Sequence, residues 1–90
     1  MANYFENLDP DTAMELELLS QLIYELRENR NSVLKFHGAQ DEAALLQQIE
    51  AGVVDEHPAY EHYLAARILT DTRETARSVL AERLKQVNRA

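Results

Sequence analysis

A chain of 90 residues with a formal net charge of −7 and no cysteine is expected to form one helical domain, residues 1–90, without disulfides, thiolate metal sites or cysteine nucleophiles. The negative charge argues against DNA or an anionic membrane surface as a partner. Because no run of 18 apolar residues and no basic, apolar leader occurs, we expect no membrane span, no signal peptide and a cytoplasmic location.

The first predicted helix spans residues 10–36. Asp9 followed by Pro10 is typical of a helix start, because the carboxylate can accept from free amide hydrogens and proline loses nothing at the first helical position. Gly38 is expected to end this helix in a left-handed conformation. Apolar residues repeat within it at three- and four-residue steps, so they share one side. They are Leu16, Leu19, Leu22, Ile23 and Leu26.

Leu18 widens this apolar stripe towards half of the helix circumference. A single short partner helix is too small to cover a stripe of this width. We therefore expect part of the stripe to form the core and part to meet another protein. The predicted core residues are Leu16, Leu19, Ile23 and Leu26. The predicted interface residues are Leu18, Leu22 and Tyr24, the last because a tyrosine ring offers apolar area with a wettable end.

Three further helices are predicted, over residues 42–51, 56–70 and 72–88. Asp41 and Gly52 delimit the first of them. Asp71 and Glu74 have the spacing of a capping box, which favours a break near residues 70–72, and a single kinked helix over 56–88 is the alternative. No period-2 alternation long enough for a sheet occurs. The fold class is therefore all-α, a small four-helix bundle-like domain.

The densest group of ligand-type side chains is His57, Glu61 and His62, in the stretch DEHPAYEHY. On a helix, His57 and Glu61 could lean over one metal ion, and imidazole with carboxylate suits iron, zinc or manganese. The alternative is a helix start with solvated polar residues. We expect no cofactor and assign no catalytic residue, and the sequence favours a binding protein over an enzyme.

Charge is distributed unevenly along the chain. Residues 1–61 hold thirteen acids against three bases, whereas residues 62–90 hold three acids against six bases. We expect the acidic first helix to pack beside the basic last helix, so that the two charge sets complement each other. A second interpretation assigns the basic helix to a nucleic-acid backbone, with Arg73 and Arg77 as the contacting residues.

These patterns favour a small acidic protein–protein interaction module with a regulatory or adaptor role. Its expected partners are a second copy of itself, in a homodimer, and another protein. The alternatives are metal or small-ligand binding at His57, Glu61 and His62, and nucleic-acid association through the last helix.

Overall fold

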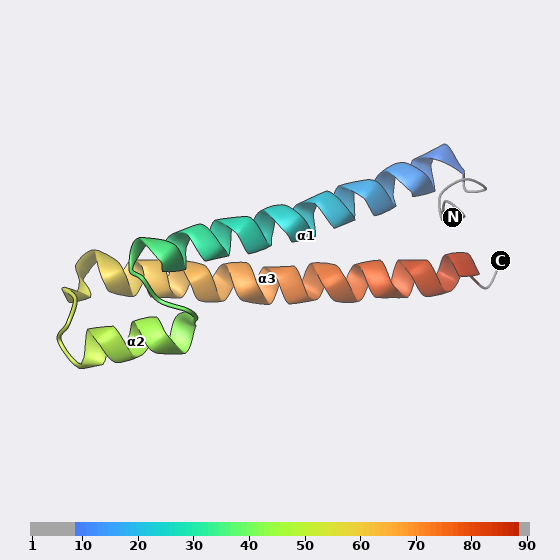
Figure 1. Cartoon of the computed structure of the whole chain (residues 1–90). Helices are drawn as coiled ribbons and strands as arrows, with labels where there is room; N and C mark the ends of the chain where they lie inside the picture. The colour runs from blue at the N-terminus through green and yellow to red at the C-terminus, as the bar shows by residue number, and fades with distance from the viewer. Residues whose placement is uncertain (1–8, 89–90) are drawn as a thin grey trace.

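The computed structural model describes residues 9–88 as three α-helices, with no strand in that range (Figure 1). The helices are α1 (Pro10–Phe36), α2 (Glu42–Glu50) and α3 (Glu56–Asn88). The all-α prediction is confirmed, and the predicted bounds of the first two helices agree with the structure to within one residue.

The ends of α1 follow from local chemistry. The Asp9 carboxylate accepts hydrogen bonds from the backbone N–H groups of Asp11 and Thr12, each at 3.2 Å. At the other end Gly38 has φ of 65°, the left-handed conformation that a side chain disfavours. Its N–H donates to the Lys35 carbonyl at 2.9 Å, which satisfies one of the last free acceptors of the helix. The predicted start and end of α1 are both confirmed.

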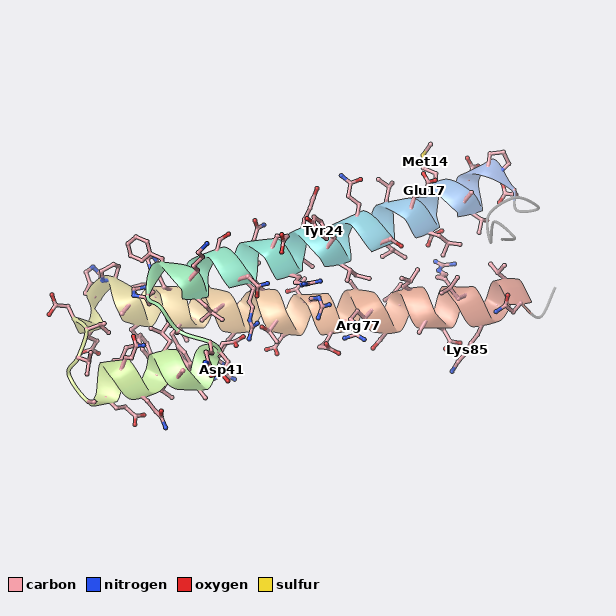
Figure 2. The ribbon with its side chains drawn as sticks, viewed as in Figure 1. Met14, Glu17, Tyr24, Asp41, Arg77 and Lys85 are labelled. Atoms are coloured by element: carbon pink, nitrogen blue, oxygen red, sulfur yellow. The ribbon has the colours of Figure 1, made fainter. Side chains whose placement is uncertain are left out.

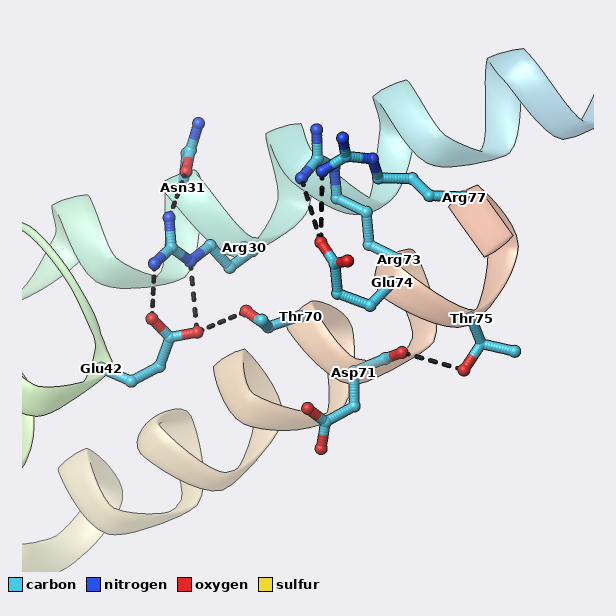
Figure 3. A network of polar contacts seen from close by, with 9 residues as sticks. All are labelled: Arg30, Asn31, Glu42, Thr70, Asp71, Arg73, Glu74, Thr75 and Arg77. Atoms are coloured by element: carbon cyan, nitrogen blue, oxygen red, sulfur yellow. Dashed lines mark hydrogen bonds and ion pairs between the residues drawn. The ribbon is translucent and has the colours of Figure 1, made fainter. Parts of the chain in front are cut away.

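The prediction of a break near residues 70–72 is wrong, because α3 keeps helical dihedral angles at every residue from Pro58 to Asn88. Asp71 lies inside the helix, where its carbonyl oxygen accepts from the Thr75 hydroxyl at 3.1 Å (Figure 3). The one residue of α3 with non-helical dihedral angles is His57, with φ of −112° and ψ of 121°, directly before Pro58. Residues 9–88 therefore form three helices and not four.

The helix α3 has no break near residues 70–72 because a single face of it points inward along its whole length. Ala59, Ala66 and Ala76 are buried, and partly buried residues continue at three- and four-residue steps between and beyond them. Tyr60, Leu64 and Ile68, which follow one another at four-residue steps, are 42%, 39% and 65% exposed. They lie on the outer side of α3 and impose no break.

The three helices differ greatly in length, and this sets the shape of the molecule. At about 1.5 Å per residue, α1 is roughly 40 Å long and α3 roughly 50 Å, whereas α2 is only about 13 Å. Figure 1 shows α1 and α3 side by side and antiparallel, with α2 against one end of α3. The radius of gyration is 17.6 Å, well above the roughly 12 Å of a compact chain of this size. The half of the molecule that α2 does not reach is a two-helix hairpin.

The core is concentrated where all three helices meet. Leu34 of α1, Leu45 of α2 and Ala66 of α3 are at most 2% exposed and pack together. Ile49 and Tyr63 pack against them. In the two-helix half, the predicted core residue Leu16 is 1% exposed. The other three are only partly buried: Leu19, Ile23 and Leu26.

A proline substitution tests the continuity of α3. Thr72→Pro removes a helical N–H and clashes with the preceding turn, so we expect a loss of about 3 kcal/mol or more in the free energy of unfolding. Urea denaturation followed by far-UV circular dichroism measures it. Thr72→Ala, which keeps the backbone hydrogen bond, should fold as stably as the wild type. A proline variant with wild-type stability would show that the helix is interrupted at this point.

Candidate functional site

An apolar groove with a volume of about 400 Å³ lies in the two-helix half of the molecule. The apolar groove is lined by apolar side chains from both long helices: Met14, Leu18, Leu19, Leu22 and Val79. Met14 and Leu18 are 61% and 59% exposed, and Leu22 and Val79 are each 41% exposed. Large apolar side chains are thus gathered on one open surface, which makes it the candidate site.

This surface arises because α1 carries a second apolar stripe beside the buried one. Met14, Leu18 and Leu22 follow one another at four-residue steps and therefore share a side of the helix. The helix α2, which could cover such a side, lies at the other end of the hairpin (Figure 1). The stripe consequently stays open to solvent.

Two of the three predicted interface residues, Leu18 and Leu22, lie together in this groove, and Tyr24 does not. Tyr24 follows Leu22 by two residues, or about 200° around the helix, so it faces a different side. It is 59% exposed, and its hydroxyl donates to Glu28 at 3.3 Å. Figure 2 shows Met14 and Tyr24 along α1.

Met14 and Val79 are groove residues that the sequence prediction missed. Met14 could have been found from its four-residue spacing with Leu18. Val79 could not, because only the pairing of α1 with α3 brings it to the groove.

The acidic first helix and the basic last helix are in contact beside the groove. Glu15, which also borders the groove, pairs with Arg83 at 3.0 Å between Oε1 and Nε. One ion pair of the expected kind therefore links α1 and α3. Both side chains are nearly half exposed, so the pair adds little stability by itself.

A polar bridge joins all three helices at the edge of the core. Arg30 of α1 donates to both carboxylate oxygens of Glu42 at the start of α2, and the hydroxyl of Thr70 in α3 donates to the same carboxylate (Figure 3). The side chains of Arg30 and Glu42 are 27% and 16% exposed. Hydrogen bonding to Arg30 lowers the pKa of Glu42. No periodicity in the sequence predicts this bridge, because Arg30 and Thr70 lie 12 and 28 residues from Glu42 in the chain.

The bridge makes stability depend on pH. The pKa of Glu42 is lower in the folded than in the unfolded chain. The ionised carboxylate therefore stabilises the fold fully at a pH above the unfolded pKa of about 4.5, and this stabilisation is lost as the pH falls through the folded pKa. Glu42→Gln should cost about 1.5–3 kcal/mol at pH 7 and flatten the acid limb of the stability curve. Urea unfolding between pH 7 and pH 3 measures both effects. Glu50→Gln is the matched control on α2, and an acid limb equally steep in Glu42→Gln would contradict the assignment.

The structure divides the predicted metal-binding trio. His57 Nδ1 lies 2.7 Å from Glu61 Oε1, and both side chains are more than half exposed. His62 instead contacts the end of α1, with its Nδ1 2.8 Å from Nε2 of His37. Within residues 9–88 no group of three or more histidine or acidic side chains is placed to hold a metal ion.

The His37–His62 contact joins the end of α1 to the first part of α3, at the end of the hairpin where α2 lies. The Phe36 ring meets both imidazoles edge-on, with centroid distances of 5.0 Å and 5.7 Å. Burial, and then the nearby His62, lower the pKa of His37 from its usual value of 6.5. The folded chain therefore favours the neutral imidazole of His37.

A second pH effect follows from His37. Since its pKa is lower in the folded than in the unfolded chain, protonation favours unfolding, and the melting temperature should fall as the pH drops below about 6.5. Differential scanning calorimetry between pH 7.5 and pH 5.5 measures this fall. His37→Gln should make it shallower, whereas Gln40→Ala, in the following turn, should leave it unchanged. An unaltered fall in His37→Gln would exclude His37 as its source.

The two residues predicted to contact nucleic acid, Arg73 and Arg77, lie beside a single carboxylate of their own helix. The Nη1 atoms of Arg73 and Arg77 are 4.0 Å and 3.3 Å from Glu74 Oε1 (Figure 3). This neighbour offsets part of their charge towards a phosphate backbone. None of the helices in the described residues combines the length and apolar character needed to cross a bilayer.

Comparison with known proteins finds one match. Residues 11–88, which cover nearly the whole of the three-helix structure, match the family described as the Uncharacterized protein MJ0235 family. No curated protein and no solved structure matches the chain.

Proposed function

We propose that this chain, which belongs to the Uncharacterized protein MJ0235 family, works as an association module whose first partner is a second copy of itself. The observation that carries this proposal is the apolar groove, where Met14, Leu18 and Leu22 are 61%, 59% and 41% exposed. Removing such side chains from water contributes about 1.5–3 kcal/mol for each one fully buried.

The arrangement of the helices supports a symmetric pairing. Two hairpin halves placed face to face form a four-helix bundle, the common way in which antiparallel helix pairs cover their apolar sides. In a two-fold pairing the same surface meets itself, so each groove residue is covered once in each copy. A chain of this size buries a smaller share of its surface than a larger domain does, and association adds further burial.

The same surface also suits the regulatory or adaptor role. A second protein with an apolar helix can take the place of the second copy, because helix-in-groove recognition requires only a row of apolar anchors. Exchange between the two partners is then the regulatory step.

Charge substitution in the groove tests the homodimer. Leu18→Glu places a carboxylate in the proposed interface, and we expect it to weaken dimerisation at least about tenfold, the effect of leaving one buried charge unpaired. Sedimentation equilibrium over a micromolar concentration range measures the dissociation constant. The matched control is Ile68→Glu, since Ile68 is equally aliphatic, 65% exposed and outside the groove. A wild-type protein that remains monomeric at high micromolar concentration would overturn the homodimer.

Salt provides an independent check of the same interface. Each copy carries a formal charge of −7, so two copies repel each other over distances that salt screens. We expect dimerisation to strengthen between low and physiological ionic strength. Weakening over this range would indicate an interface formed by ion pairs and not by the groove.

A further inference from the structure

A second, smaller pocket lies midway along the hairpin between α1 and α3. It has a volume of about 160 Å³ and is lined by Arg27, Arg30, Leu69, Thr70 and Arg73, which together define the arginine pocket. Three of the five lining residues carry a positive charge and none carries a negative one. In a chain with a formal charge of −7, three guanidinium groups thus share one hollow, with Glu42 paired to Arg30 and Glu74 4.0 Å from Arg73.

Arg30 and Arg73 occupy positions where the packing of two helices would ordinarily place apolar residues. On α1, Arg30 continues the inward row at a four-residue step after the partly buried Leu26. On α3, Arg73 lies at steps of four and three between the partly buried Leu69 and the buried Ala76. Their side chains are 27% and 30% exposed. Placing two guanidinium groups between packed helices is unfavourable unless their N–H groups donate hydrogen bonds.

The donors of the arginine pocket are only partly used within the chain. Arg30 is held by Glu42 and also donates to Asn31 at 3.2 Å, so its position is fixed (Figure 3). The Nε of Arg73 is buried and has no hydrogen-bond partner in the described part of the chain. Buried donors are almost always satisfied, so the unpaired Nε shows that the guanidinium group of Arg73, which borders the pocket, is not saturated by partners within the described residues.

We propose that the arginine pocket binds a small, doubly charged oxyanion, the chemistry shared by a phosphate group and a small dicarboxylate. Guanidinium groups present paired N–H donors that match such oxygens. Arg73 and Arg27 supply guanidinium groups from opposite helices, and Arg30 is held in place by Glu42. The pocket volume equals that of about five water molecules at ~30 Å³ each, enough for a phosphorus with four oxygens.

The competing explanation is that the arginines only fix the register of the two helices, as buried polar residues do in some coiled coils. Under that explanation the pocket has no preference for a dianion over chloride. It also predicts no role for Arg27, which is exposed and forms no ion pair within residues 9–88.

Isothermal titration calorimetry of the full chain with sodium phosphate, against sodium chloride at equal ionic strength, separates the two explanations. We expect phosphate to bind with one site per chain and chloride to give no saturable heat. Arg73→Gln should abolish the binding. Arg27→Gln should weaken it at least about tenfold, the loss of one charge-assisted hydrogen bond. Because Arg27 is exposed, this variant should fold even if Arg73→Gln does not.

Arg67→Gln is the matched control, because Arg67 lies on α3 outside the pocket and its guanidinium stacks on the Tyr63 ring at 5.8 Å. It should bind phosphate as the wild type does. A parallel titration with malonate identifies the oxyanion: tighter binding of malonate assigns a dicarboxylate, and tighter binding of phosphate assigns a phosphate group. Equal heats with phosphate, malonate and chloride, or unchanged binding in Arg27→Gln, would overturn the proposal.

The proposal is independent of the homodimer. The arginine pocket shares no residue with the apolar groove, so Leu18→Glu should bind phosphate as the wild type does even where it no longer dimerises.

Discussion

The structure depends on one geometric constraint: α2 is about a third of the length of α1 and can complete only one end of the hairpin. At that end Leu34, Leu45 and Ala66 form a dry three-helix core. At the other end, within residues 9–88, only α1 and α3 are present to bury their apolar side chains, and a pair of helices cannot enclose the outer flanks of its own stripes. The open surface of Met14, Leu18 and Leu22 is a direct result.

The polar groups mark the boundary between these two ends. Glu42, at the start of α2, meets Arg30 and Thr70 at the point where the apolar core stops. The arginine pocket begins at the same place and continues into the two-helix half. The chain thus passes from a dry core, through a layer of charged side chains, to an exposed apolar surface. Each zone offers a different chemistry to a partner.

The placement of the candidate site residues shows what sequence periodicity can and cannot reveal. It predicted an apolar stripe too wide for one core and chose Leu18 and Leu22 as the part left over, and both are exposed in the structure. It grouped Tyr24 with them although the helix turns it to another side. It also grouped His62 with His57, although His62 contacts His37, which follows the last residue of α1. The polar bridge and the arginine pocket left no periodic signal, because their members come from distant parts of the chain.

The sequence by itself determined the all-α class, the start and end of α1, and the bounds of α2. These depend on caps, a left-handed glycine and helical periodicity, all of which act within a few residues. Only the tertiary structure decided that residues 56–88 form one helix, since the inward face of α3 is set by α1 and α2 and not by its own most apolar residues. It also decided which apolar residues stay exposed, because exposure depends on where the short α2 lies.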